Sequence, residues 1–440
     1  MKIRHLLPIT ALFAGDLAAQ QPDIVEEVRE ASRPMDPIEK QNKAPEPFIS
    51  IRPTEDPEVA KFLDPTWDAA KLYFNQQNEG LQEIALTGLL HLRATRGEVQ
   101  GLPKTQRVSN RRARLGARLK AFYNTTVDAD VEFQGNDYER INDLKVRNHF
   151  NTNTWISVGK MKAPFSHEWS MHSRDMKTME RTPLVNQLHP RRSVGILIES
   201  QFDSRWGYQV GLFSGQDDRE LGGLSNPFVM LGLSYDFANE VMPERNPRVA
   251  ENAEALPERL THKEEWYLHY IHNFAPEDST VLGGSRVASG TLSANTGNPV
   301  GDNQQYRHLL ATGFNFEEQC FAVNTEMLWA RGNDDSVWGL AITPSYWVKP
   351  GQLELVGRYS YAGANNSEGL LLNADPTRDF LYSNTQVLTG DSMHSFYLGG
   401  NYYPYAEKLN IQGGIDYTVL DADNGQVEAW TYFLGTRLSF

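Results

Sequence analysis

The sequence has little cysteine, no long apolar run and no excess of positive charge. Its 440 residues contain one cysteine, Cys320, so no disulfide can form within the chain. No apolar stretch approaches the ~18 residues that a membrane-spanning helix requires, which excludes a helical membrane protein. With 42 basic and 56 acidic residues, the net charge is −14. This charge argues against nucleic acid as a partner.

Aromatic residues are abundant by contrast, at 11% of the chain, and from Leu81 onward apolar and polar residues alternate. In the last segment one face carries Trp430, Tyr432, Leu434 and Leu438, and the other carries Thr431, Gly435, Arg437 and Ser439. A period of two predicts strands with one apolar and one polar face. A soluble sandwich would show the same alternation, so the period alone leaves the architecture open.

The lengths of the connections between the predicted strands favour one architecture. Alternate connections are tight turns, such as Tyr123-Asn124 and Asp203-Ser204, whereas the four longest are 163–190, 214–263, 289–305 and 362–393. Short turns on one rim and long loops on the other are typical of outer-membrane barrels. We therefore predict an all-β fold, a transmembrane antiparallel β-barrel of about sixteen strands over residues 81–440.

One alternating stretch disturbs the strand count. Residues Phe228 to Phe237 would make a seventeenth strand, whereas single-chain bacterial barrels have even strand numbers. We interpret the stretch either as a strand within the 214–263 excursion or as half of an additional hairpin. The sixteen predicted strands include one at 279–288, and eighteen strands are the alternative.

The N-terminal part differs in composition from the rest. A basic start, a short apolar core and Ala18-Ala19 predict that residues 1–19 are a secretory signal peptide. Residues 20–80 carry eight prolines and many carboxylates, which is typical of extended or disordered chain. We predict a partly disordered periplasmic N-terminal extension here, with short helices near 24–31 and 67–74. A floppy linker is the alternative.

Aromatic residues near the predicted strand ends support a membrane environment. Six tryptophans lie there: Trp155, Trp206, Trp329, Trp338, Trp347 and Trp430. Interfacial girdles require this placement. The terminal Phe440 shares a face with Leu438 and Tyr432, and this ending is similar to the C-terminal signal that the outer-membrane assembly machinery reads. We therefore expect outer-membrane lipid and this machinery as partners.

The stretch from Trp155 to Ile198 carries several elements at fixed spacing. It reads W-I-S-V-G-K-M-K-A-P-F-S-H-E-W, continues through M-E-R, and returns as H-P-R-R-S-V-G-I-L-I. Because Pro164 cannot donate to a sheet ladder, the first strand must stop there. The pattern G-K-M-K-A-P-F-S-x-E, M-E-R and P-R-x-x-G resembles the phosphate-selective porin O and P family. This resemblance implies a bacterial outer-membrane channel and a homotrimer, with an ordinary long hairpin in another β protein as the alternative.

One predicted strand, 111–122, places four cations on a single face: Arg112, Arg114, Arg118 and Lys120. Its other face is small and apolar and must meet lipid, because Arg or Lys there costs ~2–4 kcal/mol at the bilayer midplane. The cations would therefore line the pore, attract anions and offer paired donors to phosphate. The predicted pore-lining, anion-selecting set also includes Lys160, Lys162, Arg191 and Arg192.

The following strand weakens the case for a net positive wall. Its polar face carries Asp128, Asp130 and Glu132, which a tight turn places opposite the cations. Cross-strand pairs of opposite charge commonly account for such an arrangement. Neutralised pairs would leave a polar wall with little net field, so the pattern leaves anion selectivity open.

The loop 163–190 has the place and length of a constriction inside the barrel. Its predicted constriction-loop residues are His167, Glu168, Arg174, Lys177, Glu180 and Arg181. Charges on such a loop and on the lumen face would select among solutes. A solvated surface loop is the alternative.

No motif predicts catalysis or metal binding. Ser166-His167 and His172-Ser173 are adjacent residues in a loop, an arrangement that does not indicate a nucleophile and its base. No glycine-rich phosphate loop is present, so we expect no enzyme, no cofactor and no metal. The sequence predicts a porin for passive diffusion of small hydrophilic solutes that prefers small anions. A non-specific or sugar-passing porin, a barrel enzyme and a structural barrel plugged by loops 214–263 or 362–393 are the alternatives.

Overall fold

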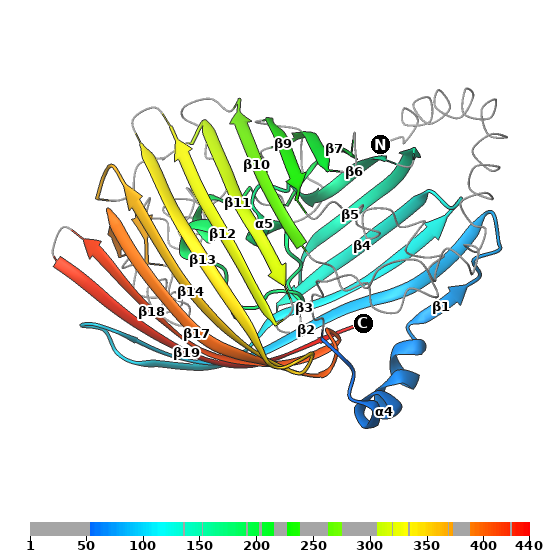
Figure 1. Cartoon of the computed structure of the whole chain (residues 1–440), viewed down its shortest axis with the longest axis horizontal. Coiled ribbons are helices and arrows are strands. Elements are labelled where there is room, and N and C mark those ends of the chain that lie inside the picture. Colours follow the sequence, from blue (N-terminus) through cyan, green and yellow to red (C-terminus); the bar gives the residue numbers. More distant parts are fainter. Residues whose placement is uncertain are drawn as a thin grey trace. The chain divides into compact units, whose positions relative to one another are not determined.

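The computed structural model describes residues 53–134, 137–151, 153–190, 192–201, 205–214, 227–237, 263–274, 306–318, 320–332, 335–367, 369–372, 388–422 and 425–440. These residues belong to one compact unit. Within them, sixteen strands follow one another around an antiparallel sheet, and the last strand pairs with the first (Figure 1). The predicted barrel is therefore confirmed.

The strands of the barrel wall have the following bounds: β2 (Leu81–Val99), β3 (Thr105–Ala121), β4 (Thr125–Gln134), β5 (Asp137–Asn151), β6 (Thr154–Lys162), β7 (Arg192–Gln201), β8 (Trp206–Phe213), β9 (Phe228–Asp236), β10 (Lys263–Asn273), β11 (His308–Glu318), β12 (Phe321–Arg331), β13 (Ser336–Lys349), β14 (Leu353–Ala364), β17 (Ser392–Tyr405), β18 (Leu409–Ala422) and β19 (Gly425–Ser439). Each strand pairs with the next along the chain, as in an up-and-down barrel.

The ambiguous stretch at 228–237 is a strand of the barrel wall. As β9 it pairs with β8 on one side and β10 on the other, so the interpretation of 214–263 as a single excursion is wrong. Its outward positions are apolar, and its inward positions change from Phe228 and Met230 to Ser234 and Asp236, so the alternation does predict a strand here. Only the even strand number, which the predicted strand at 279–288 already completed, argued against it. The predicted strand at 279–288 lies outside the described residues, and β10 pairs directly with β11.

The outer face of the barrel is a belt of exposed apolar side chains. Leu398 is 69% exposed and Leu434 60%, although both lie within strands. Further members of the belt are Leu86, Leu92, Leu115, Val146, Val158, Ile196, Leu212, Leu231, Met327, Leu340, Ile342 and Leu355. Burying such surface is worth about 25 cal/mol per Å², so the belt is stable in lipid rather than in water.

Two of the six predicted girdle tryptophans face the interior instead. Trp338 and Trp430 are exposed on the outer face. Trp155 is buried and its indole N–H donates to the Glu199 carboxylate at 2.6 Å, and the buried Trp347 packs against Tyr403. The girdle prediction is wrong for these two residues, because their positions in the strands point the side chains toward the interior. Each indole has an aromatic or charged neighbour there.

The short turns lie on the rim that also holds the end of β19. They join β3 to β4, β5 to β6, β7 to β8, β11 to β12, β13 to β14 and β17 to β18. β9 ends at Asp236 and β10 begins at Lys263 at this same rim, so this pair of strands departs from the predicted sorting of loops. By the rule for such barrels, this rim faces the periplasm.

The described N-terminal residues fold against the same rim. Helix α4 (Pro57–Asp68) begins where the Asp56 side chain accepts from the Glu58 N–H, with Pro57 at its first position. Residues Lys71–Phe74 form the short strand β1, so the prediction of a helix at 67–74 is wrong. The residues of β1 favour a strand and pair with the first part of β2, which β19 does not cover. The helix predicted near 24–31 lies outside the described residues.

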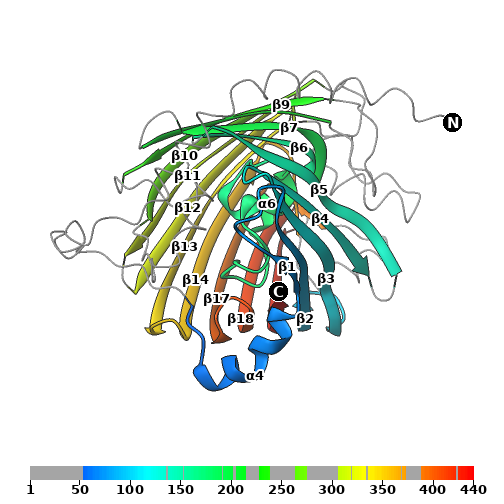
Figure 2. The same cartoon turned by 90° about the vertical axis from the view of Figure 1, so that its right-hand side faces the viewer.

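Helix α4 and β1 cover the seam where the barrel closes. Phe440 exchanges backbone hydrogen bonds with Gly88, and beyond that point β1 takes over the edge of β2. The indole N–H of Trp67 donates to the Ser439 carbonyl at 2.7 Å, and its ring packs edge-on against Tyr405 at 5.2 Å. Figure 2 shows α4 close to the end marked C. The N-terminal segment therefore ties together the first and last strands.

Replacing Trp67 with Phe tests whether the contact of α4 with the end of β19 stabilises the barrel. The variant keeps an aromatic ring against Tyr405 but loses the hydrogen bond to Ser439. We expect a loss of about 1 kcal/mol in the free energy of unfolding, seen as a lower temperature of barrel unfolding in heat-dependent gel mobility. Phe62→Leu on the same helix is the control, because Phe62 is 81% exposed. Equal unfolding temperatures of the two variants would contradict a stabilising role of the Trp67 hydrogen bond.

Candidate functional site

The long connection between β6 and β7 lies inside the barrel rather than on its surface. It carries two short helices, α5 (His167–Ser170) and α6 (Pro183–Leu188), and Figure 2 shows α6 within the ring of strands. Phe165, Met179 and Leu188 on this connection are almost completely buried. The alternative of a solvated surface loop is therefore wrong. We call residues 163–190 the inner loop.

Local sequence explains why the inner loop folds compactly. The Ser166 hydroxyl caps α5 by accepting from the Trp169 N–H at 3.1 Å. The Thr182 hydroxyl caps α6, with Pro183 at the first helical position. Ser166, whose place beside His167 does not indicate a nucleophile, thus has a structural hydrogen bond. The caps satisfy N–H groups that would otherwise be unpaired inside the barrel.

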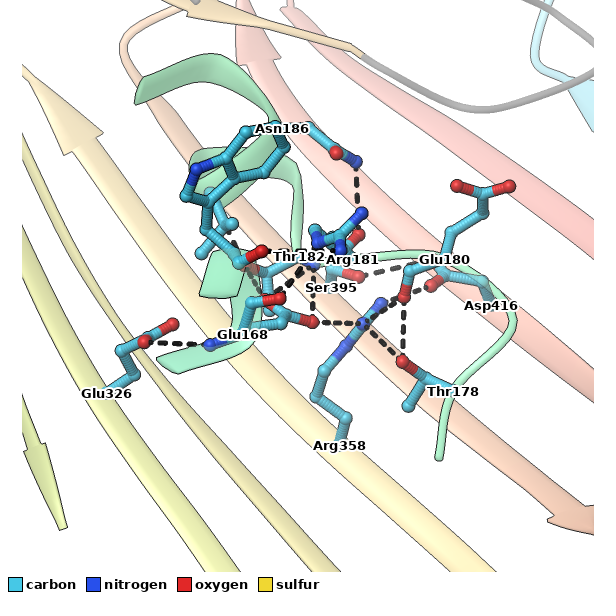
Figure 3. Close-up of polar contacts among 12 residues, drawn as sticks. Glu168, Thr178, Glu180, Arg181, Thr182, Asn186, Glu326, Arg358, Ser395 and Asp416 are labelled. Atoms are coloured by element: carbon cyan, nitrogen blue, oxygen red, sulfur yellow. Dashed lines mark hydrogen bonds and ion pairs between the residues drawn. The ribbon is translucent and has the colours of Figure 1, made fainter. Parts of the chain in front are cut away.

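Two buried wall arginines hold the backbone of the inner loop. Arg437 on β19 donates to the carbonyls of Met176 and Thr178, the latter at 3.0 Å. Arg358 on β14 donates to the Glu180 carbonyl at 2.7 Å and to the Asp416 carboxylate at 3.1 Å (Figure 3). Buried carbonyls need donors, and a guanidinium supplies several in a fixed plane. The position of the loop is therefore set by the wall.

The tip of the inner loop is fixed by further contacts. The Lys177 ammonium lies 2.8 Å from the Glu354 carboxylate, which is fully buried, and 2.8 Å from the Ser345 hydroxyl. Burial alone would lower the pKa of Lys177, but the Glu354 carboxylate raises it above its usual value. Gln412 donates to the Met176 carbonyl at 3.0 Å. The ion pair keeps Lys177 charged and immobile, so it acts as an anchor.

Glu168 closes the inner loop on itself. Its carboxylate accepts from the Thr182 N–H at 3.0 Å and from the Thr182 hydroxyl at 2.8 Å, and Arg358 lies 3.4 Å away. Arg181 donates in turn to the Glu168 carbonyl at 2.8 Å (Figure 3). The predicted loop residues Glu168 and Arg181 therefore act within the loop's own scaffold.

Glu180 is the centre of a cationic cluster. Arg111 donates two hydrogen bonds to it, at 2.7 and 3.1 Å, and Arg93 forms a further ion pair. Burial would raise the pKa of the Glu180 carboxyl, but Arg111 and Arg93 hold it well below its usual range. Arg111 reaches the cluster because the register of β3 shifts against β2 between His91 and Leu92, which leaves it as an extra residue.

The four cations of the predicted β3 row face the interior, mostly in ion pairs. Arg114 lies 3.3 Å from Glu132, Arg118 2.8 Å from Asp128 and Lys120 2.9 Å from Glu83. Arg112 is buried, with its guanidinium 3.4 Å from a ring nitrogen of His91. Asp130 stands beside Asp143 in the register of β4 and β5. Cross-strand neutralisation is therefore present along this wall.

The second predicted cation group has mixed surroundings. Lys162 donates to the carbonyls of Trp169 and Met171 at 2.9 and 3.0 Å, and so holds the inner loop. Arg192 pairs with Asp143 at 3.3 Å, and Lys160 is buried. Arg191 lies outside the described residues.

The two remaining loop residues of the prediction lie apart from the Glu180 cluster. His167 stacks on Tyr267 and contacts the Asn315 amide at 3.0 Å. Arg174 is about half exposed and pairs with its neighbour Asp175 at 3.2 Å. The structure therefore brings Glu180 to the β2–β3 arginines but leaves His167 and Arg174 elsewhere.

The open part of the lumen follows β3 to β5. Inward side chains there are partly exposed, at 30% for Arg111, 44% for Arg118 and 37% for Arg147. Those beneath the inner loop on β14 are closed off, at 1% for Glu354 and Arg358. The inner loop therefore covers the inward side chains of β14, whereas inward side chains of β3–β5 stay partly exposed to the lumen.

Sequence reasoning missed the contacts of four arginines with the inner loop: Arg93, Arg111, Arg358 and Arg437. Three of them occupy the polar faces of alternating strands, so their inward orientation was readable. Their partner, the inner loop, is distant in sequence, and no periodicity predicts that contact. Arg111 is placed by the register shift, which alternation cannot predict.

The described residues contain no group of three or more His, Cys, Asp and Glu side chains arranged to hold a metal ion. None of the helices in the described part of the chain is long and apolar enough to cross a membrane.

Replacing Arg437 with Met tests the anchoring of the inner loop. The variant leaves the Met176 and Thr178 carbonyls without this donor, so we expect the loop to move away from β19. Single-channel conductance in planar bilayers should rise and become noisier. Arg96→Met is the matched control, because Arg96 pairs with Glu98 on the outward face of β2, away from the inner loop. An unchanged conductance in Arg437→Met, with the control also unchanged, would contradict the anchoring role.

Acid sensitivity of the loop tests the Glu180 cluster. Because the pKa of Glu180 is lowered in the folded state, the stability it contributes is present above its unfolded pKa and is lost only as pH falls through the lower folded value. We therefore expect constant conductance as pH falls through about 4.3, where an ordinary glutamate takes up its proton. In Arg111→Ala a conductance step should appear at higher pH. A step near that pH in the unaltered protein would contradict this account.

Comparison with known proteins agrees with this geometry. Residues 89–225 match the family described as "Phosphate-selective porin O and P", so the resemblance seen between Trp155 and Ile198 is confirmed. That span contains β3 to β8, the inner loop and the cationic cluster. None of the curated proteins matches the chain.

Several solved structures share the fold. The outer-membrane channel DcaP of Acinetobacter baumannii superposes with a TM-score of 0.51 at 11% identity, over 84% of this chain and 100% of that one. Pseudomonas putida OprB gives 0.51 at 10% identity, over 82% and 94%. An anion-selective porin from Comamonas acidovorans gives 0.50 at 10% identity, over 81% and 99%. The apolar belt, the inner loop and these likenesses identify the chain as a bacterial outer-membrane β-barrel of the porin type, with a segment that matches the phosphate-selective porin O and P family.

Proposed function

We propose that this porin passes small hydrophilic solutes by passive diffusion and prefers small anions. The observation that carries the proposal is the composition of the cluster beside the inner loop. Three guanidinium groups, those of Arg93, Arg111 and Arg112, lie on β2 and β3 around the single carboxylate of Glu180. Arg93 and Arg112 are buried, so Arg111 is the member of this surplus of positive charge that reaches the partly exposed inward face of β3.

The physics of a narrow channel makes such a surplus effective. Opposite charges 4 Å apart attract by about 1 kcal/mol in water and by more where water is partly excluded. Low-dielectric walls also focus the field of their charges into the opening. Arg111 is the cluster member best placed to act on a solute, because it is 30% exposed. Arginine also offers paired donors that match phosphate or carboxylate oxygens.

Two comparisons support the same direction. The matching family takes its name from phosphate selectivity, and the structurally similar porin of Comamonas acidovorans is described as anion-selective. A homotrimer is proposed from the family resemblance alone.

A second function, a weakly selective or sugar-passing porin, is favoured by the ion pairs of the β3–β5 wall. Arg114–Glu132 and Arg118–Asp128 each cancel much of their own field. Such a wall still offers hydrogen bonds to hydroxylated solutes. The balance between this wall and the Glu180 cluster decides between the two functions.

Contacts of the inner loop with the β14–β17 connection favour a partly plugged barrel. The Gln187 side chain on α6 bonds to the backbone of Gly369 and of Leu371 on the short strand β15 (Leu370–Leu371), which pairs with β16 (Thr389–Gly390). In a fully plugged barrel, purified protein that is correctly folded would give no channel events in planar bilayers.

Reversal potentials in a potassium chloride gradient test the anion preference. We expect an anion-selective potential, and Arg111→Ala should reduce the anion-to-cation permeability ratio by about twofold to fivefold, the effect of up to ~1 kcal/mol of Coulomb energy. Arg118→Ala, an exposed member of a wall ion pair, is the matched control and should have a smaller effect. A cation-selective potential would overturn the anion preference and leave the porin architecture intact.

A further inference from the structure

A second polar site lies between the inner loop and the wall of β11–β13, away from the Glu180 cluster. A cavity of about 70 Å³ lies there. The loop contributes His167, Glu168 and Thr178 to its lining, and the wall contributes Asn324, Glu326 and Thr343. The cavity is large enough for more than one water molecule, and several polar groups converge on it.

Glu326 on β12 is the unusual group of this cavity. Only 4% of the residue is exposed. One carboxylate oxygen, Oε1, accepts from the Tyr267 hydroxyl at 2.5 Å and from the Glu168 N–H at 3.3 Å. The other oxygen, Oε2, is buried and accepts no hydrogen bond from any described residue. No described cation lies in ion-pair contact with Glu326, unlike Glu354 with its Lys177.

A buried carboxylate in this state needs a counterpart. Leaving one without a compensating charge or donor is costly, so such groups bind a proton, a cation or a donor-bearing ligand. The other charged groups around the cavity do not meet this need within the described residues. Lys177, which also lines the cavity, is engaged by Glu354 and Ser345. Glu168 and Glu317 add negative charge.

The lining favours a donor with a positive charge. Glu326 supplies a free acceptor oxygen, and the hydroxyls of Thr178 and Thr343 can accept as well. Apolar surface from Met171 and Met176 borders the same space and suits a short alkyl group next to a charged head. A primary ammonium, with three N–H donors, satisfies these requirements together.

We infer that this cavity binds the ammonium group of a small primary alkylammonium ion, with Glu326 as its counter-charge. The site lies on the wall opposite to the open charged wall of β3–β5. An amine-bearing solute in the lumen would therefore find a carboxylate binding site, that of Glu326, beside the inner loop. The inference concerns Glu326 alone and does not depend on the anion preference proposed for the Glu180 cluster.

Current recordings on the full-length protein in planar bilayers test this site. Ethylammonium chloride, added to a potassium chloride bath, should cause concentration-dependent interruptions of the open-channel current. In Glu326→Gln the apparent Kd for ethylammonium should rise by about tenfold or more, because a charge-assisted hydrogen bond is lost. Glu318→Gln is the matched control, since it removes the same charge from the end of β11 without lining the cavity. Equal shifts in the two variants, or none in Glu326→Gln, would overturn the site.

A measurement on the unaltered protein keeps the inference testable if Glu326→Gln does not fold. Tetraethylammonium carries the same charge as ethylammonium but has no N–H donor and is larger. At equal concentration it should leave the current uninterrupted, and equal interruption by both ions would overturn the inference. The reversal potential in potassium chloride reports the anion preference separately, so failure of either idea is recognised independently.

Discussion

Hydrogen bonds from wall guanidinium groups to the backbone of the inner loop are the interaction on which the rest of the structure depends. Arg358 and Arg437 cross from β14 and β19 to carbonyls of residues 176–180. A segment inside a barrel must satisfy its carbonyls there, and a planar guanidinium can serve several at once. Without these donors the segment 176–180 would lose its hydrogen bonds to β14 and β19, and the positions of Lys177 and Glu180 within it would change.

The held loop divides the interior into two unlike sides. Against β14 and β17–β19 the inward residues are buried and serve to anchor it. Along β3–β5 the inward residues remain partly exposed, and their charges alternate in sign. The exposed charges that a solute in the lumen would meet therefore differ between the two sides, and the anion preference proposed above rests on the few charges near Glu180 rather than on the net charge of the whole chain.

The same asymmetry separates two kinds of charged site. Glu180 is surrounded by more positive charge than it carries, so it remains ionised and leaves a cationic border. Glu326 accepts hydrogen bonds from the Tyr267 hydroxyl and the Glu168 N–H, but no described cation is in ion-pair contact with it. Two carboxylates within or beside one loop can therefore have opposite roles, since the environment and not the residue type sets the local field.

Much of the fold could be predicted from the sequence, because a barrel wall needs only strand alternation and sorted connections. Those features indicated sixteen strands, the inward face of β3 and the ion pairs with Asp128 and Glu132. They did not decide the role of Phe228–Asp236, because the predicted strand at 279–288 already completed an even number of strands. They failed at Trp155 and Trp347, which lie near strand ends but on the inward faces of their strands. The sequence predicted a helix at 67–74 instead of the helix Pro57–Asp68, because the proline-rich composition of this region indicated extended chain although Asp56 and Pro57 can begin a helix.

Local chemistry in the sequence determined which faces meet lipid and water, since the side-chain period of a strand is fixed by its backbone. The tertiary structure alone decided which water-facing residues meet one another. Arg93 and Glu180 are far apart in the chain, as are Arg437 and Met176, yet they touch once the sheet closes and the loop folds inward. Contacts of this kind arise from closure and from a register shift, and neither leaves a periodic trace in the sequence.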